Sequence, residues 1–106
     1  MTEFVVVLIT ASKEDEAAAI AKELVDSGLA ACVNIIADIR SIYRWQGKTE
    51  DAREALLVVK SRRDLLSDLV VRVKELHSYR VPEVIALPIL DGSGDYLDWL
   101  RQETRP

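Results

Sequence analysis

Cysteine and histidine are nearly absent from this sequence, which has one of each, Cys32 and His77, among 106 residues. A single cysteine forms no internal disulfide and no Cys-x-x-Cys motif. A disulfide framework and copper-chaperone chemistry by a thiol pair are therefore excluded, and the lone thiol favours a reducing compartment. A chain of this length predicts one domain, residues 1–106.

Excess positive charge and long apolar runs are also missing. The chain has 14 Lys and Arg against 18 Asp and Glu, a net charge of −4. An acidic chain without a basic stripe is not expected to bind nucleic acid. No stretch approaches the roughly 20 apolar residues of a membrane span, and the apolar run near the N-terminus is too short for a signal peptide. We therefore expect a cytoplasmic protein that contacts no membrane.

The hydrophobic pattern switches between the period of a strand and that of a helix along the chain. Ser12 with Asp15 fits a capping box that starts a helix, Gly28 suits its end, and Asp64 suits the start of a second helix. The predicted strands are residues 4–10, 31–45, 54–60 and 84–89, with a turn at 46–50. The predicted helices are residues 12–27, 64–76 and 95–102.

This order of elements, β-α-β-β-α-β with a short final helix, predicts an α+β fold of the ferredoxin-like type. Such a fold has an antiparallel sheet with its helices on one face. The segment 31–45 is unusually long for a strand and would reach roughly 50 Å at ~3.3 Å per residue. We expect it to project from the domain or to bend at a bulge. Pro88 cannot donate a ladder hydrogen bond, so the strand 84–89 is predicted to lie at an edge.

The strands at 4–10, 54–60 and 84–89 are apolar on both faces. A sheet covered by helices on one face only should carry polar residues on the other. The second face is therefore predicted to be buried as well, and the chain has no spare helix to cover it. We expect a homo-oligomer in which the long strand reaches into a neighbour. The alternative is an apolar face that binds a different protein.

Four blocks of sequence carry a family resemblance. The blocks LAACVNII, SIYRWQGK, LHSYRVPEVIALPI and DYLDWL (residues 29–36, 41–48, 76–89 and 95–100) resemble the CutA family, the divalent-cation tolerance proteins, in order and spacing. The resemblance implies a homotrimer of ferredoxin-like subunits whose sheets meet edge to edge, and a link to tolerance of copper and other divalent metals. The family's trimer is similar to that of the PII signalling proteins, which implies small-ligand sensing by analogy.

His77 and Cys32 are candidate metal ligands, because imidazole and thiolate suit copper and zinc. Tyr79 and Glu83 share a loop with His77, so these side chains can converge. The alternatives are a histidine that caps a helix C-terminus and a cysteine that acts as a small buried apolar residue. Some family members carry a further cysteine where this chain has Ile9, so one soft ligand is missing here.

Glu83 enters an apolar strand, where a carboxylate needs a partner. Lys60 is the candidate partner, either in a structural ion pair or in a polar cleft between subunits that binds an anion or a metal. Tyr43 and Trp45 lie on the projecting strand, and with Pro88 they are predicted to pack at the trimer interface. We also expect Trp45, Lys60 and Tyr79 to line the cleft.

No catalytic set is visible, so the chain is not expected to be an enzyme. We expect a trimer that binds a divalent metal, copper in particular, weakly at a cleft between subunits through His77, Glu83 and Cys32. The alternatives are a PII-like module that binds a small anion near Lys60, and a structural trimer that supports another protein's assembly. The short predicted turn at 46–50 argues against PII-like loop signalling.

Overall fold

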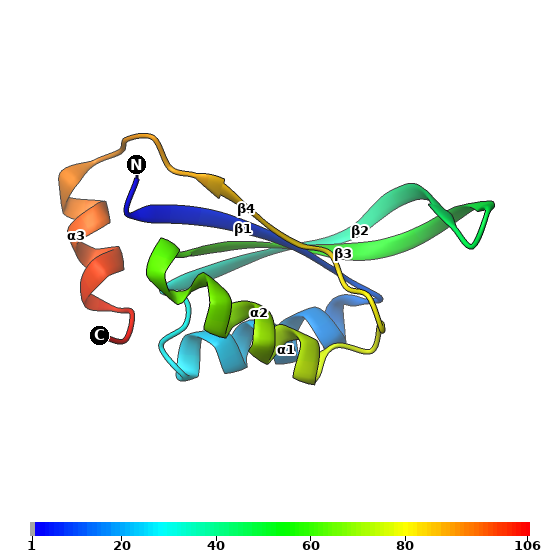
Figure 1. The fold of residues 1–106 in the computed structure, drawn as a ribbon, viewed down its shortest axis with the longest axis horizontal. Helices are drawn as coiled ribbons and strands as arrows, with labels where there is room; N and C mark the ends of the chain where they lie inside the picture. Colours follow the sequence, from blue (N-terminus) through cyan, green and yellow to red (C-terminus); the bar gives the residue numbers. More distant parts are fainter. Residues whose placement is uncertain (1) are drawn as a thin grey trace.

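The computed structural model describes residues 2–106 and contains a four-stranded antiparallel sheet (Figure 1). In chain order the elements are β1 Phe4–Ala11, α1 Glu14–Asp26, β2 Cys32–Trp45, β3 Lys48–Arg62, a 3-10 turn Arg63–Leu65, α2 Leu66–Leu76, β4 Val84–Pro88 and α3 Gly94–Gln102. The strand order is β2-β3-β1-β4. The predicted α+β class and its ferredoxin-like order of elements are confirmed.

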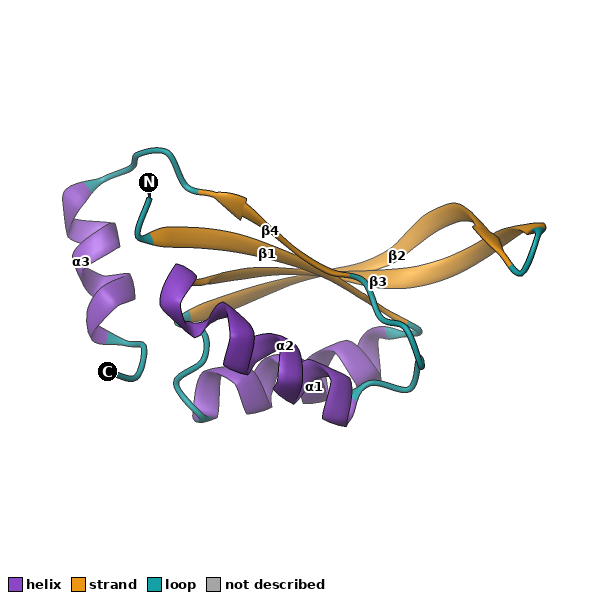
Figure 2. Ribbon diagram, viewed as in Figure 1, coloured by secondary structure: helices purple, strands orange, loops and turns teal. Residues whose placement is uncertain are grey.

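Helices α1 and α2 pack against one face of the sheet (Figure 2). Alternate residues of β1 and β3 point into this core because side chains of a strand alternate between its two faces. Burying a Leu, Ile or Val side chain contributes about 1.5–3 kcal/mol, so this layer supplies most of the apolar stabilisation. Its buried members include Val5, Val7, Ile9, Ala11, Leu57 and Val59 from the sheet, and Ile20, Leu24, Leu69 and Val73 from the helices.

The opposite face of the sheet is apolar, and no helix covers it beyond its end at Phe4 and Cys32, where α3 packs; we call it the open face. Ile36, Ile85 and Leu87 lie on it and are each about half exposed, at 50%, 53% and 51%. Because α1 and α2 pack on the other face, no helix buries the apolar side chains around these three residues. β4 lies at an edge of the sheet, as Pro88 predicts.

β2 and β3 form a long hairpin that projects from the body and gives the molecule a length of 44 Å against 25 and 23 Å (Figure 1). Gln46 and Gly47 alone make the turn, both with positive φ (51° and 80°), the conformation that two-residue hairpins prefer. The predicted turn at 46–50 and strand start at residue 54 are therefore wrong. The polar residues 48–53 do form a strand, because both faces of the projecting arm are in water.

A β-bulge divides β2 between Ile36 and Ile39, with Asp38 at φ 61°. One extra residue in β2 moves every later side chain to the opposite face. Val33 therefore faces the helices, whereas Tyr43, also an odd-numbered residue, faces the open side. The expected bulge is confirmed, and it interrupts the alternation of faces along residues 31–45.

Both predicted helix starts differ from the structure. α1 begins after Lys13 without a side-chain cap. Glu16 of its first turn accepts hydrogen bonds from the backbone N–H and the hydroxyl of Ser12, each at 2.9 Å; Asp15 is not the partner. Asp64 does not cap α2. It accepts from the Arg62 guanidinium at 3.0 Å, and α2 begins after the 3-10 turn.

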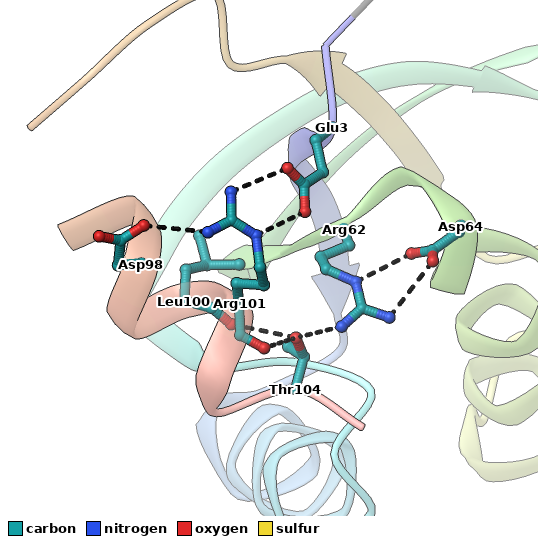
Figure 3. Close-up of polar contacts among 7 residues, drawn as sticks. All are labelled: Glu3, Arg62, Asp64, Asp98, Leu100, Arg101 and Thr104. Carbon is teal, nitrogen blue, oxygen red and sulfur yellow. Dashed lines mark hydrogen bonds and ion pairs between the residues drawn. The ribbon is translucent and has the colours of Figure 1, made fainter. Parts of the chain in front are cut away.

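Helix α3 is held at the N-terminal end of β1 by two guanidinium groups (Figure 3). The buried Arg62 donates to the Thr104 hydroxyl at 3.1 Å, and Arg101 donates twice to Glu3 at 2.9 Å. Beneath them Leu100 is fully buried. These contacts lie at the end of the sheet away from the base of the arm.

Gly28 follows α1 with φ +75°, and a Cβ there would lie 3.0 Å from Cβ of Arg105. Gly28→Ala is expected to lower the free energy of unfolding by about 1–3 kcal/mol, because it adds a clash to the left-handed backbone strain. Gly47→Ala is the matched control, since φ is +80° there and no atom lies within 4 Å. Denaturant midpoints at equal protein concentration compare the two, and equal losses would contradict the contact with Arg105.

Candidate functional site

A cleft with a volume of about 660 Å³ opens where the arm leaves the body. Three parts of the chain line it: the end of β1, one side of the arm from Glu54 at its base to Trp45 beside the turn, and the loop that joins α2 to β4. The lining side chains with polar or aromatic character include Tyr43, Trp45, Glu54, Tyr79, Arg80 and Glu83. The cleft thus gathers residues that are distant in the sequence.

His77 anchors the α2–β4 loop to the end of β1. Its imidazole is fully buried (0% exposed), with Nε2 2.7 Å from the Thr10 carbonyl oxygen, and Nδ1 accepts from the backbone N–H of Tyr79 at 3.0 Å. A carbonyl only accepts, so Nε2 carries the proton. β4 pairs with β1 only as far as Ile9, and His77 therefore satisfies the next carbonyl in place of a strand.

Glu16 reinforces this anchor from helix α1. Its Oε2 accepts from the backbone N–H of Ser78 at 2.7 Å and lies 3.9 Å from Nδ1 of His77. Burial alone would raise the pKa of Glu16, but the hydrogen bonds from Ser78 and Ser12 outweigh it and lower the pKa from 4.5 to about 2. The carboxylate therefore joins the start of α1 to the loop that follows α2.

Glu54 is a charged residue buried at the cleft, only 6% exposed. The Tyr79 hydroxyl donates to its Oε2 at 2.7 Å. Burial, and then this contact with Glu54, raise the pKa of Tyr79, so the hydroxyl stays a donor. Glu54 is absent from the sequence-based candidates, although a carboxylate directly before the apolar run ALLVV is the kind of residue that needs a partner.

The structure brings together only part of the predicted set. Tyr43, Trp45, Tyr79 and Glu83 line the cleft, whereas His77 lies behind it with both ring nitrogens occupied. In this arrangement the imidazole has no free nitrogen for a metal. His77 is the C-cap residue of α2, which is the position that the alternative of a capping histidine predicts. It does not act there as a cation on the helix dipole, because its Nδ1 accepts a hydrogen bond.

Lys60 and Cys32 lie opposite each other in β3 and β2, level with Val6. Val6 is four residues before Thr10, the residue of β1 that lines the cleft. Lys60 and Cys32 therefore lie about 13 Å along the sheet from it, at ~3.3 Å per residue. Lys60 donates to the Asn34 side chain and to the Val58 carbonyl. The predicted ion pair between Lys60 and Glu83 is therefore not formed within the chain.

Cys32 is half-buried near Tyr96 of α3. Burial, and to a smaller extent the contact with Cys32, raise the pKa of Tyr96. In residues 2–106 no three His, Cys, Asp or Glu side chains lie close enough together to hold a metal ion. No helix in the same residues is long and apolar enough to cross a membrane.

One family matches nearly the whole sequence. The model described as "CutA1 divalent ion tolerance protein" matches residues 5–103. The divalent-cation tolerance protein CutA of Thermus thermophilus is 54% identical over 99 residues, 93% of this chain and 96% of that protein. Human protein CutA is 45% identical over 96 residues, 91% of this chain and 54% of its own length. The chain thus spans little more than half of that longer relative.

Solved structures give the same match. The divalent cation tolerance protein of Thermus thermophilus superimposes with a TM-score of 0.94 at 52% identity, covering 96% of this chain and 99% of that one. Rice CutA1 superimposes with a TM-score of 0.95 at 43% identity, covering 98% and 95%. A structure titled as a periplasmic CutA of Archaeoglobus fulgidus has a TM-score of 0.92 at 40% identity, covering 94% and 97%.

Because the pKa of Glu16 is lowered on folding, its contribution is complete above pH 4.5 and is lost as the pH falls toward about 2. At about 1.4 kcal/mol per pH unit, the interval from 4.5 to about 2 corresponds to a contribution of about 3–4 kcal/mol. Glu16→Gln is expected to lower stability at neutral pH by that amount and to flatten the loss between pH 4.5 and 2.

Chemical denaturation at a series of pH values measures this effect. Glu14→Gln, at an exposed position in the same first turn, is the control and should leave the slope nearly unchanged. If the curves of wild type and Glu16→Gln ran parallel down to pH 2, the role of this carboxylate would be refuted.

Proposed function

The chain belongs to the CutA1 divalent ion tolerance family, and on that basis we propose that it is a non-catalytic binding protein of the cytoplasm. It assembles as a homotrimer and binds a divalent cation weakly in the cleft at the base of the arm. The cation chemistry is supported by the names of its relatives, which describe divalent-cation tolerance. The placement in the cytoplasm rests on the single thiol, which favours a reducing compartment.

The open face supports self-association. Ile36, Ile85 and Leu87 form an apolar surface on the side of the sheet without helices, and each is about half exposed. Apolar surface of this kind on a small domain marks an interaction site. The number of copies, three, is taken from the family resemblance. The projecting arm, on which Tyr43 and Trp45 are each 42% exposed, would reach a neighbouring copy.

Glu83 is the predicted metal ligand that this arrangement favours most. Its carboxylate is exposed and lines the cleft, and Glu54 supplies a second carboxylate there. Carboxylates suit hard divalent cations, whereas copper in particular would need His77 or Cys32. His77 would first have to release Thr10 or Tyr79. Cys32 lies away from its own chain's cleft, so it can contribute only from another copy.

PII-like signalling through a long mobile loop is not favoured. The arm ends in a two-residue turn between Trp45 and Lys48, which is shorter than the turn predicted from the sequence. A turn of this length is part of the hairpin and leaves no free loop for a partner to read.

Sedimentation velocity at micromolar concentration is expected to show three copies for the wild type. Leu87→Glu puts a charge on the open face and is expected to give monomers, because burying an unpaired charge is costly. Val71→Glu is the control: Val71 is exposed to 59% but lies on α2, away from the open face. A monomeric wild type, or two variants that sediment alike, would contradict the proposed interface.

Calorimetric titration with Cu²⁺ and Zn²⁺ is expected to show weak binding to the wild type. Glu83→Gln should weaken it by about tenfold or more, since even the loss of a hydrogen bond to a metal ligand costs that much. Monomeric Leu87→Glu should lose it, because residues 2–106 of one chain hold no three-ligand group. Unchanged binding in both variants would refute the site.

A further inference from the structure

We propose that the cleft binds a small organic cation, a primary ammonium compound with an apolar body, and that Glu54 is its counter-charge. This goes beyond the proposed metal function, because the ligand belongs to another chemical class and needs no metal. The proposal rests on three properties of the cleft: a buried carboxylate without a cationic partner, aromatic walls, and an acidic balance of charge.

The Glu54 carboxylate is buried but poorly compensated. It is 6% exposed, and the Tyr79 hydroxyl is its one hydrogen-bond donor among residues 2–106. Over the same part of the chain no Lys, Arg or His nitrogen lies within ion-pair distance of it. An ionised carboxylate has about four acceptor positions, and burying it without a cation is costly. A ligand ammonium group that enters the cleft can supply both the charge and further donors.

Aromatic side chains line the cleft from two directions. Tyr43 and Trp45 come from the arm, and Tyr79 comes from the α2–β4 loop. The β-bulge in β2 puts Tyr43 and Trp45 on the same sheet face as Glu54. The faces of tyrosine and tryptophan rings attract cations within about 6 Å. A ligand whose ammonium group reaches Glu54 would therefore meet Tyr79 there, and its body would pass Tyr43 and Trp45, which lie further along the arm, opposite Glu50 and Lys48.

The size and charge of the cleft select the class of ligand. A volume of about 660 Å³ lies in the range of small-molecule sites, about 300–1,000 Å³. The charged lining residues are Glu54, Glu83 and Arg80, two carboxylates against one guanidinium, which disfavours an anion. Ile42 and Val81 also line the cleft and suit an apolar body on the ligand.

Tryptophan fluorescence can test the proposal with defined probes. Trp99→Phe removes the tryptophan of α3, whose ring is tilted against that of Tyr96 with centroids 5.4 Å apart, and leaves Trp45 in the cleft as the single reporter. The probes are phenethylammonium, the neutral 2-phenylethanol and the anionic 3-phenylpropionate, titrated in the presence of EDTA. We expect saturable binding of the ammonium compound, binding of the alcohol that is weaker by about tenfold or more, and no saturable binding of the carboxylate.

Two variants in the Trp99→Phe background identify the group responsible. Glu54→Gln keeps the shape and an acceptor for Tyr79 but removes the charge, so phenethylammonium should bind about tenfold more weakly or worse. Glu14→Gln is the control, since Glu14 is an exposed carboxylate in the first turn of α1 and does not line the cleft, and its affinity should stay close to that of the parent.

Tyr79→Phe keeps the aromatic wall and removes the hydroxyl that occupies Glu54, so it should bind phenethylammonium at least as well as the parent. This variant tests the proposal even if Glu54→Gln does not fold. Equal affinity for the alcohol, equal losses in the two glutamate variants, or loss of binding in Tyr79→Phe would overturn it. Absence of saturable phenethylammonium binding to the assembled Trp99→Phe parent would also overturn the proposal. It would mean that Arg80 or a neighbouring copy already occupies the Glu54 carboxylate. EDTA removes divalent metal from these titrations. Failure of the metal proposal would therefore leave the ammonium proposal unaffected.

Discussion

The buried imidazole of His77 is the contact on which the cleft depends. It joins the carbonyl of Thr10, near the end of β1, to the backbone N–H of Tyr79, and it does so without exposure to water. A buried carbonyl left unpaired costs about 1–3 kcal/mol, so both the strand end and the loop are stabilised by the same ring. Glu16 adds a charged hydrogen bond to Ser78 on the next residue.

The position of this loop, together with the bulge in β2, determines the chemistry of the cleft. The anchored loop places the Tyr79 hydroxyl against Glu54, and the bulge turns Tyr43 and Trp45 to the same side. The cleft therefore arises from two backbone features at opposite walls. His77 contributes by positioning these groups, while the carboxylates of Glu54 and Glu83 face the cleft and are available to a cation.

Periodicity was sufficient for much of the fold and for little of the site. The apolar runs of β1, β3 and β4 predicted the sheet and its second apolar face, because burial on both sides leaves a continuous run. The bulge at Asp38 flips the face of Tyr43 through one inserted residue, which no side-chain pattern marks. The partner of His77 is a backbone carbonyl, and every residue carries one, so the ring's role could be assigned only in three dimensions. Glu54 was missed because its burial depends on Tyr79, which is distant in the sequence.

The protonation state of the single histidine tests the central claim most directly. Because His77 is the chain's one histidine, long-range ¹H–¹⁵N correlation spectra of its ring give an unambiguous reading at neutral pH. The anchor predicts a proton on Nε2, held by Thr10, a bare Nδ1 that accepts from Tyr79, and no change of either ¹⁵N shift when Zn²⁺ is added. A proton on Nδ1, or a ring whose ¹⁵N shifts respond directly to the metal, would contradict the positioning role and return His77 to the metal ligands.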